Sequence, residues 1–182
     1  MKLLSPIISI ILILIIIASP VQAQDSTAYG PDHYEVDRDL KEELNLVYIG
    51  ASWCVPCLDD SLKQDLEKIK LLLYEEAKNN EMNYSVIGIA NDQSIEKGWG
   101  LLNGTGYFDE AIIGKKWTNT GSINFIWNQE VLQPAVPQII VFRRSMEFKE
   151  GIEIGKKEVL IRKVGVNAIH QWLEDGAILN YV

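Results

Sequence analysis

The feature that most constrains the fold is the order of three patterns in the first half of the chain. Residues 44–49 (LNLVYI) form a short apolar run rich in strand-forming side chains. Cys54 and Cys57 follow closely, and leucine and isoleucine then recur at helical spacing through residues 58–73, with charged side chains between them. This order predicts a buried strand that leads into a long helix over residues 57–79, with both cysteines at the junction.

The rest of the chain predicts an α/β fold with a mixed central sheet flanked by helices. Its expected elements are strands at 84–90 and 138–142, an antiparallel hairpin at 147–154 and 158–163, and a helix at 166–173 that ends near Gly176. Residues 93–134 carry tryptophans among glycines without a clear period, with one or two helical turns expected at 109–116 and a strand or helix at 125–131. We interpret residues 93–134 as an insertion in a single domain over residues 44–182.

The chain has only two cysteines, Cys54 and Cys57. A disulfide that closes so short a loop constrains the unfolded chain very little, so chemistry explains the pair better than stability does. A cysteine at a helix N-terminus faces unpaired backbone N–H groups and the positive end of the helix dipole, which favour thiolate over thiol. Pro56 is tolerated in a first helical turn. We therefore predict that Cys54 is the exposed nucleophile and Cys57 the shielded resolving thiol.

Two motifs resemble the thioredoxin superfamily. Residues 53–57 (WCVPC), in which Val55 and Pro56 separate the cysteines, resemble its active site after an apolar strand. Val136 and Pro137, directly before the third strand, resemble its cis-proline loop. The resemblance implies a thioredoxin-like fold with the insertion placed before the cis-proline strand. It also implies a cis Pro137 and a Val136 backbone that hydrogen-bonds an extended client chain.

The resemblance covers residues 44–92 and 135–175, and an exported chain with an insertion resembles the bacterial TlpA-like and ResA-like reductases. Trp53 is then expected to be half-buried and to line the client groove. The implied reaction is reduction of client protein disulfides, in a role in cell redox homeostasis. It needs an unidentified electron donor and neither an organic cofactor nor a metal.

Three further positions bear on the rate or the direction of the reaction. The family's buried Asp, six residues before the first cysteine, is replaced here by Tyr48, which affects the rate rather than the type of reaction. Asp59 and Asp60 suit a helix start, and their charge opposes a very acidic Cys54 thiolate. Val55 and Pro56 between the cysteines, together with these two carboxylates, favour a reductase, with a disulfide oxidase or isomerase on the same site as the first alternative.

A second alternative is a non-enzymatic module that binds and delivers Cu(I) through the CxxC pair, since soft thiolates select Cu(I). Such a site needs a histidine beside the cysteines. His33 and His170 are the only histidines, and we expect both at the surface, away from the pair. The tryptophans outside the motif are expected in the core.

The N-terminus predicts export. Lys2 precedes a nearly continuous apolar run at residues 3–17, and small residues at 21–23 suit a signal peptidase. We predict a cleaved signal peptide at residues 1–23, a leader at residues 24–43, and a periplasmic or secreted protein. The alternative is an uncleaved anchor, which alone would bring membrane contact, although the run is short of the roughly 20 residues that span a bilayer. The net charge of −8 disfavours nucleic acid as a partner.

Overall fold

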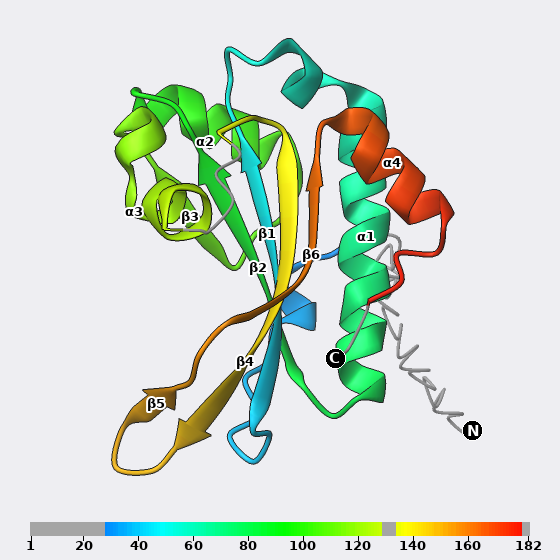
Figure 1. Cartoon of the computed structure of the whole chain (residues 1–182), viewed down its shortest axis with the longest axis vertical. Coiled ribbons are helices and arrows are strands. Elements are labelled where there is room, and N and C mark those ends of the chain that lie inside the picture. The colour runs from blue at the N-terminus through cyan, green and yellow to red at the C-terminus, as the bar shows by residue number, and fades with distance from the viewer. Residues whose placement is uncertain (1–27, 129–133, 180–182) are drawn as a thin grey trace, which may run out of the picture.

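The protein, seen here in a computed structural model that describes residues 28–128 and 134–179, is built around a mixed sheet (Figure 1). Its strands are β1 (Glu42–Gly50), β2 (Asn83–Ala90), β3 (Glu110–Ile113), β4 (Gln138–Phe148), β5 (Ile152–Ile154) and β6 (Glu158–Val164). They are ordered β3-β2-β1-β4, and β4 pairs with β6 along its first half and with β5 at its last residues. The predicted signal peptide and the start of the leader lie outside the described residues.

The sheet combines two units. The strands β1, β2 and β3 are mutually parallel, whereas β4 runs antiparallel to β1 and β6 antiparallel to β4. The longer helices are α1 (Asp60–Asn79), α2 (Ile95–Asn103) and α4 (Val166–Glu174). A parallel β1-α1-β2 unit therefore meets an antiparallel β4-β6-α4 unit at the centre of the sheet. This is the thioredoxin-like arrangement, which confirms the predicted fold class.

Each face of the sheet has its own apolar cluster. On the first face, alternate residues of β1 and β4 pack with Leu62, Leu66 and Ile69 of α1 and with Ile169 of α4. The two helices lie side by side along this face (Figure 1). On the second face, the other residues of the same strands pack against Phe125 and the rest of the segment that follows β3. Because both faces are covered, β1 is buried throughout its apolar run.

The junction after β1 differs from the prediction. A 3-10 turn, η2 (Val55–Leu58), carries Cys57, and α1 begins only at Asp60. Asp59 is extended and accepts a hydrogen bond from the backbone N–H of Ser61 at 2.8 Å. This carboxylate caps α1 and separates it from the cysteine turn, because the capping residue cannot itself be helical. The predicted helix start at residue 57 is therefore wrong.

The predicted strands are wrong where the structure depends on which strands pair within the sheet. Residues 147–154 are not one strand, because β4 continues to Phe148 and turns back into β5. Residues 158–163 pair with the first half of β4 rather than with residues 147–154, so the predicted hairpin is wrong. Residues 110–113 form the edge strand β3 instead of helical turns, since they complete the open edge of β2.

Part of the insertion after β2 covers the second face of the sheet. The insertion contains α2 and β3, followed by η3 (Lys116–Thr118), α3 (Thr120–Ser122) and a π-type turn, η4 (Ile123–Trp127). The last of these agrees with the helical alternative expected near residue 125, while residues 129–131 lie outside the described part. Within the described ranges, the structure holds no helix both long and apolar enough to cross a membrane.

Candidate active site

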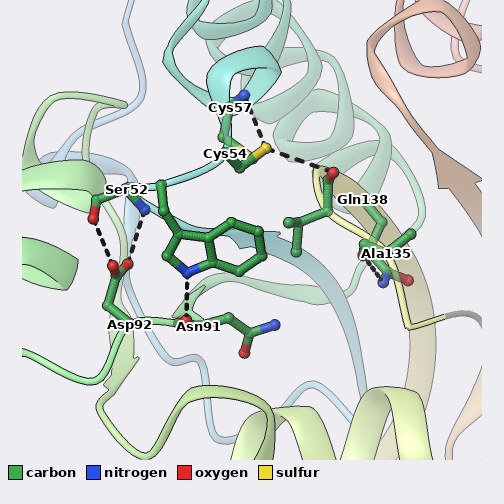
Figure 2. The surroundings of a disulfide bond; sticks show 9 residues. Ser52, Cys54, Cys57, Asn91, Asp92, Ala135 and Gln138 are labelled. Carbon is green, nitrogen blue, oxygen red and sulfur yellow. Dashed lines mark hydrogen bonds between the residues drawn. A yellow bond between two sulfur atoms is a disulfide. The ribbon is translucent and has the colours of Figure 1, made fainter.

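Cys54 and Cys57 form a disulfide where β1 leads into α1 (Figure 2). Cys54 is the N-cap of η2, and the backbone N–H of Cys57 donates to Cys54 Sγ at 3.2 Å. Cys57 is completely buried, whereas Cys54 keeps 6% of its surface exposed. Cys54 is thus the more accessible sulfur, but it is far less exposed than the motif predicted. The same N–H group can stabilise a Cys54 thiolate once the bond is reduced.

The loop before β4 faces this disulfide. The Val136–Pro137 peptide bond is cis, as the resemblance implies. The carbonyl oxygen of Val136 lies 3.6 Å from Cys54 Sγ. Gln138 holds the loop by donating from its side-chain amide to the carbonyl of Ala135 at 2.6 Å (Figure 2). The structure therefore brings residues 53–57 and 136–137 to one place.

Arg162 of β6 stabilises the same loop through a hydrogen bond to Gln138. Its guanidinium donates to Gln138 Oε1 at 2.6 Å and to the carbonyl of Phe125 at 2.7 Å. Burial lowers the pKa of this guanidinium. Arg162 thus joins three segments, because one side chain connects the insertion, the cis-proline strand and β6. The sequence showed no sign of this role, since an arginine within an alternating strand is usually solvated.

Trp53 lies beside the disulfide, 55% exposed, with its indole N–H donating to the carbonyl of Asn91 at 3.1 Å. Ser52 is held by Asp92, which accepts from the Ser52 backbone N–H at 3.0 Å and from its hydroxyl at 2.6 Å (Figure 2). Asn91 and Asp92 were missed as site residues. They directly follow β2, and the C-terminal ends of adjacent parallel strands meet at one edge of a sheet, which is the signal that could have found them.

A groove of about 700 Å³ opens beside the disulfide. One side is formed by the cysteine turn, the other by the cis-proline loop and the start of α4. Its lining residues are Val55, Pro56, Asp59, Val136, Pro137, Val164, Gly165, Val166, Asn167 and Ala168. The groove is mainly apolar with one carboxylate, so it suits a peptide backbone with small or apolar side chains more than a highly charged ligand.

Tyr48 stands where the family carries an acid, and it is completely buried. Its ring lies over Gly50, where a Cβ atom would collide with it, and stacks on Phe108 at a centroid distance of 6.1 Å. Among the described residues its hydroxyl has no hydrogen-bond partner. Burial raises the pKa of this phenol. Tyr48 therefore cannot accept a proton as a carboxylate would.

The histidines belong to other parts of the fold. His170 of α4 contacts Asp65 of α1 through Nδ1 at 2.8 Å, and it is half-exposed. His33 is partly buried and stacks on Tyr29 at a centroid distance of 5.2 Å, which differs from the expected surface position. Within the described ranges, no three side chains from histidine, cysteine, aspartate and glutamate gather as a metal site.

The expectation of core tryptophans holds for only part of the set. Trp172 of α4 is buried, and Trp117 is partly buried against the second apolar cluster. Trp99 and Trp127 are 56% and 40% exposed. Both belong to the insertion. Its apolar side chains follow no clear helical or strand period, so the sequence does not predict which of them are buried.

The comparisons with known proteins concern the fold. No protein-family model and no curated protein matches the chain. The structure is similar to a thiol-disulfide oxidoreductase from Bacteroides fragilis NCTC 9343, with 20% identity, coverage of 73% of this chain and 80% of that one, and a TM-score of 0.38. It is also similar to yeast Sco1, with 14% identity, coverage of 74% and 84%, and a TM-score of 0.36.

Copper-bound yeast Sco1 gives 14% identity, coverage of 79% of this chain and 80% of that one, and a TM-score of 0.34. These proteins share the thioredoxin-like fold. At this level of identity the likeness extends to the fold alone.

Proposed function

We propose that this chain is a thiol–disulfide oxidoreductase that reduces the disulfides of client proteins through Cys54 and Cys57. The observation that carries the proposal is the asymmetry of the pair. The Cys54 residue keeps 6% of its surface exposed and its Sγ faces the cis-proline loop, while Cys57 is fully covered. An attacking thiol must be reached by a client sulfur, whereas a resolving thiol only has to reach its neighbour.

In the proposed reaction the Cys54 thiolate attacks one sulfur of a client disulfide. The client S–S bond breaks, a mixed disulfide forms, and the other client sulfur leaves as a thiolate that takes up a proton. Cys57, after losing its proton, attacks Cys54 Sγ, restores the Cys54–Cys57 bond and releases the second client thiol. The client gains two electrons and the protein loses two. An external dithiol or other two-electron reductant must then return the pair to the reduced state.

In this proposal the client protein binds in the groove beside the disulfide. Val136 offers a backbone carbonyl beside Cys54, Pro137 shapes the loop, and Trp53 offers an exposed ring next to Cys54 in the sequence, beyond the residues that line the groove. An extended client segment can add its backbone to this loop as a strand adds to a sheet edge. These assignments to Trp53, Val136 and Pro137 are part of the proposal.

The reducing direction is supported by the surroundings of Cys54. Asp59 occupies the N-cap of α1, and its backbone and side-chain hydrogen bonds with Ser61 lower its pKa. A carboxylate that is already charged at this point interacts with the helix dipole in place of the thiolate and repels a second negative charge. Strong oxidants of this fold depend on a stabilised thiolate, which these contacts disfavour.

A redox titration tests the direction. We expect the purified protein, equilibrated with glutathione buffers, to give a reduction potential near that of thioredoxin, about −270 mV. A potential above roughly −150 mV would instead identify a disulfide oxidase, whose best-studied bacterial example lies at about −120 mV.

A trapping experiment tests the reaction itself. The variant Cys57→Ala should accumulate mixed disulfides with client proteins through Cys54, which non-reducing gels and mass spectrometry would identify. The double variant Cys54→Ala/Cys57→Ala is the matched control and should trap nothing. Stoichiometric retention of Cu(I) by the reduced protein, together with no insulin reduction, would instead favour the copper-delivery alternative.

The location outside the cytoplasm is a separate part of the proposal, and the apolar segment at residues 3–17 supports it. Expression in a bacterial host should yield a mature protein that begins at Gln24, in the periplasm or the medium. Intact-mass measurement of the processed chain checks this, and a protein that retains residues 1–23 in the membrane fraction would indicate the anchor alternative.

A further inference from the structure

Three tryptophan rings form a continuous row that begins at the disulfide. Trp53 directly precedes Cys54, and its ring centroid lies 6.3 Å from that of Trp117. Trp117 in turn lies 6.4 Å from Trp127, in an edge-to-face arrangement. We call Trp53, Trp117 and Trp127 the tryptophan row. Trp117 and Trp127 come from the insertion, so the insertion extends the surface around Cys54.

The two exposed rings of the row are held in place by their only polar atoms. Trp53 donates its indole N–H to the carbonyl of Asn91 at 3.1 Å, and Trp127 donates to the carbonyl of Trp117 at 2.6 Å. Trp117 is anchored on the second apolar cluster. The free faces of Trp53 and Trp127 therefore offer apolar contact with their indole donors already paired, and rings that are already ordered lose little entropy on binding.

The chemistry around the row indicates which side chains it accepts. Ile123, on the π-type turn with Trp127, is 39% exposed and adds apolar surface. Lys115 and Lys116, both exposed, directly precede Trp117 and disfavour a positively charged guest there. Aromatic rings gain from edge-to-face or offset contact with exposed indoles. An aromatic side chain therefore fits the row better than a lysine or an arginine.

We propose that the tryptophan row binds the client segment next to the reactive cysteine and selects clients with an aromatic side chain there. This inference rests on the proposed function, because the client sulfur must reach Cys54 and its neighbours then lie along the row. An extended chain advances about 3.3 Å per residue, so the row covers side chains within about four residues of the client cysteine. The aromatic preference belongs to the insertion rather than to the cysteine motif.

Two matched peptide disulfides test the proposal. They differ only in carrying phenylalanine or serine three residues from the cysteine on both sides. The protein is reduced with dithiothreitol and desalted, and the second-order rate constant for each peptide is measured by stopped flow. We expect the phenylalanine peptide to react about two- to thirteenfold faster, since one aromatic contact is worth about 0.5–1.5 kcal/mol.

The variant Trp127→Ala should bring the ratio of the two rate constants close to one. Trp99→Ala is the matched control, because Trp99 is an exposed tryptophan on α2 that lines a different hollow with Tyr107 and Phe108. This control should keep the wild-type ratio. Equal rates in the wild-type protein, or an unchanged ratio in Trp127→Ala, would overturn the proposal.

A binding measurement separates this proposal from the proposed function. If neither peptide is reduced, the oxidoreductase assignment fails, and the row is then tested by titrating the oxidised protein with a phenylalanine peptide whose cysteine is replaced by serine. Shifts of the Trp53 and Trp127 indole N–H signals in NMR spectra support the row, and unshifted signals overturn it. A dimer in sedimentation that Trp127→Ala dissociates would make a second copy the occupant and also overturn the proposal.

Discussion

At the scale of single residues, the main departure from the resemblance is Tyr48. The position calls for a buried acid that could take the proton of the resolving thiol, and the chain places a phenol with a raised pKa there. Gly50 makes room for the ring, and Phe108 stacks on it. Tyr48 therefore has a packing role, and the proton of Cys57 must leave by another route.

We expect Tyr48→Phe to leave the free energy of unfolding unchanged or to raise it by up to about 1 kcal/mol. The reason is that the change keeps the ring and removes a buried hydroxyl that lacks a hydrogen bond within the described residues. Guanidinium unfolding curves measure the effect. Tyr29→Phe is the control, because the Tyr29 hydroxyl donates to Asp109 at 2.9 Å and its loss should cost about 1 kcal/mol.

At the scale of elements, α1 does more than present the cysteines. Its middle carries Lys70, which is fully buried and pairs with Glu67 at 2.6 Å. The Lys70 ammonium also donates to the carbonyl of Tyr107 at 2.9 Å and lies 4.2 Å from the centre of the Phe108 ring. Burial lowers the pKa of this ammonium. This lysine ties α1 to the chain that enters β3.

We expect Lys70→Met to lower the free energy of unfolding by about 2–4 kcal/mol. The variant retains an unbranched apolar chain but leaves the Glu67 carboxylate and a loop carbonyl without their cation. Lys63→Met on the same helix removes an ion pair to the exposed Asp60 and should cost less than about 0.5 kcal/mol. Denaturation midpoints compare the two variants, and equal losses would contradict this assignment.

The contact between α1 and α4 should make stability depend on pH. The hydrogen bond to Asp65, and then its charge, raise the pKa of His170 above its ordinary value of 6.5, with Glu174 adding to the effect and Lys68 opposing it. The folded state therefore binds the proton more tightly than the unfolded state. This stabilisation is complete below pH 6.5 and is lost as pH rises through the higher folded pKa.

We accordingly expect the difference in unfolding free energy between the wild-type protein and His170→Gln to be largest near pH 6 and to shrink toward pH 8.5. Urea unfolding across this range measures it. Asp65→Asn should remove most of the same pH dependence, because it neutralises the main partner of His170. A difference that is constant with pH would show that the contact acts through packing alone.

At the scale of the whole molecule, the candidate active site lies where two units meet. The β1-α1-β2 unit supplies the cysteines together with Asn91 and Asp92, and the β4-β6-α4 unit supplies the cis-proline loop. Arg162 and the insertion join the two units behind that loop. Neither unit alone holds Cys54 against Val136, so the site depends on the complete fold.

The proposed reducing direction predicts a protein that is more stable when oxidised. We expect the oxidised protein to unfold at a higher guanidinium concentration than the reduced protein. The difference in the free energy of unfolding should be only about 1–2 kcal/mol, because the disulfide closes a short loop. Strong oxidants of this fold show the reverse, since their reduced form is the stabilised one. A more stable reduced form would therefore contradict the reducing direction.

Much of the fold could be predicted from local patterns. The strands β1 and β2 and the helix α4 agree with the apolar runs at 44–49, 84–90 and 166–173 to within a residue or two. The start of α1 could not be predicted, because Asp59 caps the helix two residues after Cys57 and the cysteines lie in a separate 3-10 turn. The predictions of a hairpin at 147–154 and 158–163 and of helical turns at 109–116 were wrong. Strand pairing in both regions depends on which strand edge is open, and that is a property of the assembled sheet.

The sequence by itself determined the proposed chemistry of this protein, because two cysteines separated by two residues after a buried strand indicate a redox-active pair. Only the tertiary structure decided what surrounds them: the carbonyl of Val136 beside Cys54, the brace from Arg162, and the row that runs from Trp53 to Trp127. The physical reason is distance along the chain. Helix and strand periods act over a few residues, whereas these contacts join segments dozens of residues apart that meet only when the sheet has formed.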